Sequence, residues 1–334
     1  TPPMADARRA VRECLQRHAG DIPDGALFLI AVSGGADSLA LAWASAWEIP
    51  KLGYRTRAVI VDHQLQEGSS EVAERARAAV ESFGLEADVV TVSVAGDGGL
   101  ENAARDARYE ALTIHAETHG AHAVLLGHTL DDQAETVLLG LTRGSGPQSI
   151  SGMRDLNGLW WRPFLPLRRS ATEQALRDID VSWWSDPHNT DRVFVRPRIR
   201  HDVMPVLEDA LGPGVAEALA RTAELVREDA DYLDQQATEA MGSVRDGHSL
   251  NIKRLQHLPP VIASRVVRRA TLDITGEGLS HTHTDQVMAL VNAWKGQGPV
   301  DIPGGTVSIL PVAKKLADGV GSATPLGGLM MFMF

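Results

Sequence analysis

The sequence predicts an α/β protein, in which a parallel sheet with helices on both faces is followed by a smaller, mainly helical C-terminal domain. Apolar, β-branched runs alternate with stretches of helical periodicity over residues 28–144. The chain has 334 residues, 44% of them apolar, which suits two domains rather than one. A Gly-Pro-Gly break at residues 212–214 precedes a long amphipathic stretch. We therefore expect one domain over residues 1–210 and a second domain over residues 211–334.

Four short apolar runs are expected to be buried strands, at residues 28–32, 57–63, 88–94 and 122–128. Helical stretches lie between and after them, at residues 38–47, 69–84, 100–120 and 130–144. This alternation indicates right-handed βαβ units and a parallel sheet covered on both faces. A ligand is then expected at the carboxyl ends of the strands, where polar residues gather: Ser33, Asp62, His63 and His128.

The rest of the chain is less regular. Residues 144–190, rich in Gly, Pro, Trp and Arg, predict loops with one helix at 171–179. Beyond the break we expect a helix at 215–241, helical stretches near 259–273 and 284–295, and a short strand pair over residues 300–310. For the apolar tail GGLMMFMF, residues 327–334, docking on the body and disorder both remain open.

Composition excludes several classes of protein. Cys14 is the single cysteine, so there is no disulfide framework, no cysteine-pair zinc site and no iron–sulfur cluster. No apolar run reaches the ~18–20 residues that span a bilayer, and residues 1–20 lack a signal-peptide pattern. We expect a cytoplasmic protein with no membrane partner. The oligomeric state stays open, a homodimer included.

The charge is uneven along the chain. The net charge of −11 argues against a nucleic-acid partner, but residues 143–200 contain ten arginines and no lysine against six acidic residues. Surface salt bridges and a phosphate-contacting surface both account for such a segment.

The turn SGGADS follows the first predicted strand and opens a helix. It comprises Ser33, Gly34, Gly35, Ala36, Asp37 and Ser38. Backbone N–H groups in such a turn, aimed by a helix N-terminus, form an anion site, and the serine hydroxyls can donate to phosphate. The turn lacks the lysine of the common phosphate loop, and a carboxylate facing phosphate is repulsive unless a cation lies between them, so Asp37 implies Mg²⁺. The competing interpretation is an ordinary tight turn with a helix cap.

The stretch GHTLDDQAET, residues 127–136, places carboxylates in the first turn of a helix at a strand end. Asp132 and Glu135 are three residues apart, and Asp131 and Glu135 four apart, so each pair shares a helical face. Acids at a helix start also serve as plain capping groups. Beside a phosphate loop they favour a cation site, for a metal or a substrate ammonium.

Two patterns in the helix at 100–120 are weaker. Glu101, Arg105 and either Arg108 or Tyr109 fall on one face of this helix. A Glu–Arg pair at this spacing stabilises a helix by only ~0.3–0.5 kcal/mol. An arginine near a bound phosphate, however, would stabilise the negative charge that develops during reaction. The HAETH segment at 115–119 superficially resembles a zinc metalloprotease helix. Its glutamate is one position off and no third ligand is evident, so we expect no zinc.

Together these stretches resemble one family. SGGADS is similar to the signature of the PP-loop ATP pyrophosphatases, which adenylate an acceptor and release pyrophosphate. The combination resembles the bacterial tRNA(Ile)-lysidine synthases, in their short form, over nearly the whole chain. The further segments that carry it are VDHQLQ (61–66), ENAARDARY (101–109), GHTLDDQAET (127–136), RGSGPQSISGM (143–153), RPFLPLR (162–168), DPHNTDRVFVRPRIRHDVMP (186–205) and VDIPGGTVSIL (300–310).

The resemblance implies a two-step reaction. ATP adenylates the C2 oxygen of the wobble cytidine in the CAU anticodon of a tRNA(Ile), and the ε-amine of free lysine then displaces AMP. Decoding changes from AUG to AUA.

The resemblance also implies residue roles. Ser33–Ser38 would bind the ATP phosphates, with Asp37 on Mg²⁺, and Asp62, His63 and His128 would line the ATP site. Asp132 and Glu135 would bind lysine, either of them being a candidate proton acceptor, and Arg105 would approach the α-phosphate. Contacts to tRNA are implied for Arg143, Arg196 and Arg200, and for the C-terminal domain over residues 211–334, while residues 1–210 would form the catalytic PP-loop domain.

The chain departs from the family pattern at Gln66, Ser149, Ile150 and Pro197, which puts local tRNA or loop contacts in doubt. Rival functions are a tRNA thiolation enzyme, a GMP or NAD synthetase and a nucleotide-binding sensor module. A thiolation enzyme relies on cysteines, of which Cys14 supplies only one, and a synthetase would need its own acceptor motifs. A sensor module has no use for the acids at 132 and 135.

Overall fold

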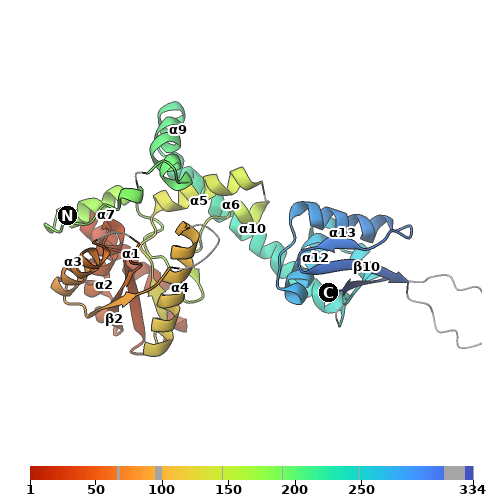
Figure 1. The fold of residues 1–334 in the computed structure, drawn as a ribbon, viewed down its shortest axis with the longest axis horizontal. Coiled ribbons are helices and arrows are strands. Elements are labelled where there is room, and N and C mark those ends of the chain that lie inside the picture. Colours follow the sequence, from red (N-terminus) through yellow and green to blue (C-terminus); the bar gives the residue numbers. More distant parts are fainter. Residues whose placement is uncertain are drawn as a thin grey trace, which may run out of the picture. The chain divides into compact units, whose positions relative to one another are not determined.

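The computed structural model describes residues 1–65, 68–94, 100–144, 146–189, 191–247, 249–311 and 328–333 (Figure 1). It separates into two compact units, one of residues 1–139 and 152–221 and the other of residues 140–151 and 222–334. The division at 221–222 falls within one helix, α10 (Val215–Val244). The predicted domain boundary at residue 210 stays a prediction.

The first unit contains the predicted sheet. Its strands lie in the order β3 (Ala87–Thr91), β2 (Arg55–Asp62), β1 (Leu27–Val32), β4 (Ala123–Leu125), β6 (Trp160–Trp161) and β5 (Leu156–Asn157). Every neighbouring pair is parallel except β5 with β6. The four predicted strands are confirmed, and because β1, β2, β4 and β6 are parallel, their carboxyl ends meet at one edge.

Helices cover both faces of this sheet, as predicted. Alternate residues of β1 point to opposite faces: Phe28 and Ile30 pack with α1 (Pro2–Arg17), α2 (Ala36–Glu48), α3 (Ser69–Ser82) and α7 (Arg169–Arg177). Leu27 and Leu29 pack against Leu112 and Ala116 of α4 (Leu100–His119).

The helix α5 (Leu130–Arg143) follows β4, and α8 (Val195–Arg198) and α9 (Met204–Leu211) precede α10. The sequence did not assign α8 and α9, because Pro197 and Pro205 interrupt their periodicity. A π-helical turn, Ile199–Val203, joins them. Among the described residues, no helix combines the length and apolarity needed to cross a bilayer.

The second unit holds α6 (Pro147–Ile150), α11 (Ile252–Gln256), α12 (Pro260–Thr275) and α13 (His281–Ala293). It also has an antiparallel sheet in the order β7 (Arg245–Asp246), β8 (Ser249–Asn251), β11 (Gly328–Met333), β10 (Gly305–Pro311) and β9 (Val300–Ile302). The predicted strand pair is β9 and β10. The apolar tail supplies β11, which pairs with both β10 and β8, so residues 328–333 dock on the body as a strand.

Candidate active site at the carboxyl edge of the sheet

The phosphate loop connects β1 to α2. The Ser38 hydroxyl accepts from the Ser33 N–H (3.1 Å) and donates to the Gly35 carbonyl (2.9 Å), which fixes the turn. Gly34 has φ +83°, which favours glycine, and its carbonyl accepts from the Trp184 N–H at 3.0 Å. Because α2 begins at Ala36, its N-terminal N–H groups face this turn, the geometry expected of an anion site.

Gly127 brings the end of β4 against the phosphate loop. A Cβ on Gly127 would lie 3.0 Å from the carbonyl carbon and oxygen of Asp37 and 3.1 Å from the Cα of Ser38. Only a glycine allows this approach without a backbone shift. The contact places α5, which starts three residues later, beside the first turn of α2.

Asp37, Asp132 and Glu135, which we term the acidic triad, converge on the guanidinium of Arg169. Arg169 Nε lies 3.2 Å from Asp37 Oδ2, Nη2 lies 2.7 Å from Asp132 Oδ1, and Nη1 lies 3.7 Å from Glu135 Oε1. The Thr172 hydroxyl, also on α7, donates to Asp37. One arginine thus joins acids from α2 and α5.

A second arginine closes the triad from the other side. Arg200 binds Glu135 through Nε (2.8 Å) and Nη2 (3.2 Å), and its Nη2 lies 3.5 Å from Asp132. Arg196 Nη1 is 3.8 Å from Glu135. Asp132 also caps α5, because its Oδ2 accepts from the N–H and the hydroxyl of Thr129 at 2.8 and 2.9 Å. Asp132 therefore caps α5 and contacts two arginines, and its predicted role in binding a metal or a substrate ammonium stays a prediction.

Burial and charge act differently on the acids of the triad. Burial raises the pKa of Asp37 from its ordinary 3.8 to about 6, against the opposing effects of Arg169 and Thr172. Burial also acts to raise the pKa of Asp132, but Arg169, the Thr129 N–H and nearby cations outweigh it and hold that pKa below its usual range. Asp37 is the member of the triad that is costly to ionise until a further cation arrives.

Three arginines form a second group, the basic cluster, defined here as Arg105, Arg108 and Arg162. The guanidinium carbons of Arg105 and Arg108 lie 5.3 and 5.6 Å from the centre of the Tyr109 ring, and Arg162 follows β6 at the carboxyl edge of the sheet. Burial lowers the pKa of both Arg108 and Arg162, and Arg105 lowers it further. Within the described part of the chain, Nε of Arg108 and of Arg162 has no hydrogen-bond partner.

Two histidines stand beside the basic cluster. Burial lowers the pKa of His128 to about 4; Asp132 opposes this, while Arg162, Arg108 and Arg105 add to it. Burial and Arg108 likewise lower the pKa of His63. Nδ1 of each ring has no hydrogen-bond partner among the described residues. Buried unpaired donors beside like charges are unfavourable unless an anionic or polar ligand completes them.

Asp62 lies at the end of β2, but both of its oxygens have protein partners. Oδ1 accepts from the Gln64 N–H at 3.0 Å and Oδ2 from the Ser70 hydroxyl at 2.9 Å. Its predicted contact with ATP stays a prediction.

The structure therefore brings together most of the residues singled out by the sequence: the phosphate loop, the acidic triad, Arg105, His63, His128, Arg196 and Arg200. Arg196 and Arg200 face the triad, whereas Arg143 ends α5 and belongs to the second unit. Sequence reasoning missed Arg169, Thr172 and the basic role of Arg162. The two consecutive arginines after Pro166, at the start of a helix, were the available signal.

Among the departures from the family pattern, Ser149 lies in α6 and its hydroxyl donates to the carbonyls of Gly146 (2.8 Å) and Gly140 (3.2 Å). Ile150 ends α6 and Pro197 is buried in α8. Gln66 lies outside the described residues.

A small pocket adjoins the triad. It measures about 180 Å³, and it is lined by Asp131, Glu135, Arg168, Arg200, Met204, Pro205 and Glu208. Its walls carry both signs of charge.

Comparison with known proteins agrees with this geometry. Residues 7–207 match the PP-loop domain family and residues 250–310 match the TilS substrate binding domain. The tRNA(Ile)-lysidine synthase of Thermobifida fusca is 48% identical over 307 residues, covering 91% of this chain and 94% of that protein. That of Leifsonia xyli is 49% identical over 286 residues, covering 84% and 86%.

A solved structure, the U34-tRNA thiolase NcsA from Methanococcus maripaludis with its [4Fe-4S] cluster, superposes with a TM-score of 0.57. It is 17% identical and covers 67% of this chain and 80% of its own, which indicates a likeness of fold alone. The long, close matches to curated relatives decide the family. The chain belongs to the tRNA(Ile)-lysidine synthases, a family of ligases with a PP-loop ATP-utilising domain.

Proposed function

We propose that this chain ligates L-lysine to C2 of the wobble cytidine of a CAU-anticodon tRNA(Ile), with cleavage of ATP to AMP and pyrophosphate. The observation that carries the proposal is the pairing of two opposite sites at one sheet edge. An acidic triad suits a cationic amine, and a basic cluster beside a phosphate loop suits a nucleotide.

ATP would bind across the phosphate loop and the basic cluster. The N-terminus of α2 and the hydroxyls of Ser33 and Ser38 would hold the β- and γ-phosphates that leave together. Arg105 and Arg108 would approach the α-phosphate, where charge accumulates during adenylation. The unpaired Nδ1 of His63 and of His128 would meet polar groups of the nucleotide.

Asp37 would hold Mg²⁺. The donor fits, because the Asp37 carboxylate is a hard oxygen ligand beside the phosphate loop, and a nearby dication would offset the cost of ionising Asp37. When bound, the metal neutralises phosphate charge and favours departure of pyrophosphate. Arg169, 3.2 Å from Asp37, supplies part of this positive charge from the protein.

Lysine would occupy the small pocket beside Glu135. A zwitterionic amino acid with a second ammonium needs carboxylates and an arginine, and Glu135, Asp131 and Arg168 line that pocket. Asp132 and Glu135 pair with the guanidinium groups of Arg169 and Arg200 in this structure. We expect the ammonium group of the substrate to take the place of one of these guanidinium groups. Either acid could accept the proton that the attacking amine must lose.

The proposed reaction has two steps, adenylation of the cytidine and displacement of AMP by lysine. The C2 oxygen of cytidine attacks the α-phosphorus, forming a C–O–P linkage as the bond to pyrophosphate breaks. The neutral ε-amine of lysine then attacks C2, the C2–O bond breaks with loss of AMP, and the amine proton passes to an acid of the triad.

The tRNA would contact arginines of the basic segment, residues 143–200. Arg143, Arg196 and Arg200 are proposed tRNA contacts. The side chain of Arg196 is 35% exposed, and its contact with Glu135 is long, at 3.8 Å, so its guanidinium is available to bind a tRNA phosphate. Arg200 is engaged by Glu135 at 2.8 Å and would act closer to the lysine pocket.

A thiolation reaction is disfavoured by the state of Cys14. The thiol is buried and burial raises its pKa to about 12, so it stays protonated near neutrality. It is the single cysteine of the sequence and offers no pair for sulfur handling.

Pyrophosphate release tests the proposal. We expect release from ATP to require a CAU-anticodon tRNA(Ile) and to continue through many turnovers only with lysine. The matched control is the same tRNA with cytidine 34 changed to uridine. Release without tRNA, or equal release with both tRNAs, would contradict the proposal.

A further inference from the structure

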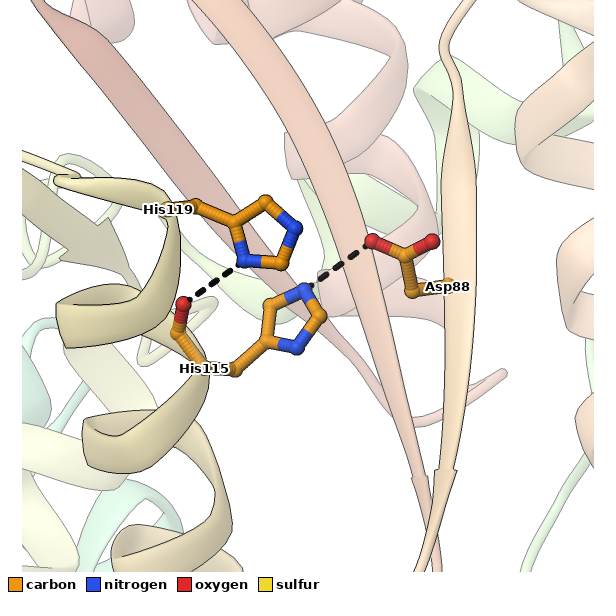
Figure 2. Close-up of side chains that lie close together, drawn as sticks. All are labelled: Asp88, His115 and His119. Carbon is orange, nitrogen blue, oxygen red and sulfur yellow. Dashed lines mark hydrogen bonds and ion pairs between the residues drawn. The ribbon is translucent and has the colours of Figure 1, made fainter.

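A separate cluster of metal-ligating side chains lies between β3 and α4 (Figure 2). Asp88 is the second residue of β3 and pairs in register with Val59 of β2, whose side chain is buried on the α4 face. Asp88 therefore also points to that face, where α4 presents His115 and His119. Sequence inspection found the two histidines but no third ligand, because Asp88 is remote in the chain.

This cluster is distinct from the candidate active site. Val59 precedes Asp62, at the carboxyl end of β2, by three residues, so Asp88 lies roughly 10 Å back along the strands. His115 and His119 lie in the last turns of α4, whereas Arg105 and Arg108 lie toward its start.

The three side chains already meet. His115 Nε2 lies 2.9 Å from Asp88 Oδ2, and the two imidazole rings are 4.1 Å apart between centroids. One ligand atom from each residue can be chosen so that all lie within 4.8 Å of one another. Tetrahedral bonds of about 2.0–2.1 Å place ligand atoms roughly 3.4 Å apart, so modest rotamer adjustment would suffice.

The histidine spacing and the outer hydrogen bonds suit a metal. Residues i and i+4 share a helical face. His119 Nδ1 lies 2.9 Å from the His115 carbonyl oxygen, which leaves Nε2 as the free ligand atom, and Figure 2 shows that nitrogen on the side of Asp88. A backbone carbonyl on the other ring nitrogen is the usual partner of a ligating histidine.

Arg57 is the one competing cation among the groups the structure places on Asp88. Its Nη2 lies 2.7 Å from Asp88 Oδ1, its Nε contacts Oδ2, and its Nη1 lies 2.7 Å from Glu86. The two negative charges of Asp88 and Glu86 offset the positive charge of Arg57 and part of the charge of a divalent cation. Since each carboxylate oxygen accepts more than one partner, Arg57 can stay as the group that orients Asp88.

We propose that Asp88, His115 and His119 form a binding site for a late first-row divalent cation of the Zn²⁺ class. Two imidazoles and one carboxylate are ligands that Zn²⁺ prefers, and three protein ligands leave a fourth position for water. A cation bound here links β3 to α4 and stabilises that face of the sheet.

The test is a titration of the full chain, freed of metal, with Zn²⁺ against a competing fluorescent indicator, without ATP. We expect about one equivalent to bind with saturation. His119→Gln and His115→Gln should each weaken binding at least ~10-fold. The matched control is His281→Gln, which removes an exposed histidine paired with Asp285 at 2.8 Å and should change nothing.

Two further readouts separate this site from misfolding and from the reaction. Zn²⁺ should raise the unfolding temperature of the wild type and not that of His119→Gln. Pyrophosphate release by His119→Gln should equal that of the wild type. The absence of saturable Zn²⁺ binding to the wild type, or binding that survives both histidine substitutions, would overturn the proposal and leave the proposed ligase function untouched.

Discussion

The acidic triad and the basic cluster lie at the same edge of one sheet, but the acids are paired with opposite charges whereas the arginines of the cluster lie near like charges. Each acid of the triad has a cationic partner within 3.8 Å, supplied by Arg169, Arg196 or Arg200. In the basic cluster like charges face one another, and Nε of Arg108 and of Arg162 is unpaired among the described residues.

The difference shows which half of the site has more of its charge paired within the protein. Each acid of the triad has an ion pair that supports the fold, although burial still raises the pKa of Asp37, and a substrate ammonium must replace one of these ion pairs. The arginines of the basic cluster repel one another, and this unfavourable electrostatic free energy is offset when an anionic nucleotide binds. Removing a cation should therefore have opposite consequences in the two regions.

The largest effect is expected from Asp37→Ala. Loss of the carboxylate that would hold Mg²⁺ should reduce turnover at least ~1,000-fold, because the negative charge of the leaving pyrophosphate would no longer be neutralised by the metal. Filter binding should show that tRNA affinity persists. If tRNA binding and the folding transition are lost along with turnover, the role assigned to Asp37 is wrong.

Arg169→Ala should destabilise the protein. The Arg169 side chain is 19% exposed, and its removal leaves Asp37 without its cationic partner and Asp132 with only the 3.5 Å contact to Arg200, which should cost about 3 kcal/mol in the free energy of unfolding. Urea denaturation measures this, and Mg²⁺ should restore part of the loss.

The control for that measurement comes from the same helix. Arg177→Ala removes an exposed arginine paired with Glu173 at 2.8 Å and should cost less than about 0.5 kcal/mol. Equal losses for the two variants would show that the triad does not depend on Arg169.

Arg108→Met should behave in the opposite way. Arg108 has a neighbouring arginine and an unpartnered Nε, against which its contact with Tyr109 is the main compensation, so exchange for an apolar side chain should leave the unfolding free energy nearly unchanged. The KM for ATP should rise at least ~10-fold, since the cluster loses a phosphate contact. A destabilised variant with an unaltered KM for ATP would remove the distinction between the two regions.

A further effect concerns the pH dependence of stability at His128. Its folded pKa of about 4 lies below the ordinary 6.5, so between these values the unfolded chain binds more protons and stability falls as pH falls from 6.5 toward 4. His128→Gln should lessen this fall by roughly 1–3 kcal/mol. Urea denaturation at several pH values measures it, and an identical pH dependence in both proteins would rule out a buried neutral His128.

A related measurement follows His128 by NMR. Bound ATP should raise the pKa of His128, because phosphate offsets the charge of the neighbouring arginines. No movement of that pKa at saturating ATP would place the phosphates elsewhere.

The sequence was informative wherever a single segment carries its own signal. The strands, the phosphate turn and the helix with Asp132 and Glu135 were predictable from periodicity and local motifs. The start of α7 was placed two residues late, because its first N–H, that of Arg169, is capped by Asp131 at 2.7 Å from a distant segment.

What escaped prediction depends on contacts between remote segments. Arg169 meets Asp37 across 132 residues of chain, and Asp88 meets His115 across 27. The tail strand β11 pairs with β8 and β10, and these partners could not be predicted from the composition of the tail. Local patterns identified the chemical groups, and only the fold determined which of them neutralise one another.

The ligase activity is tested by incorporation of radiolabelled lysine into CAU-anticodon tRNA(Ile), with parallel measurement of AMP. We predict one AMP for each lysine attached, with attachment lost when cytidine 34 is replaced by uridine. AMP formation without lysine attachment, or attachment to the uridine-34 tRNA, would contradict the account.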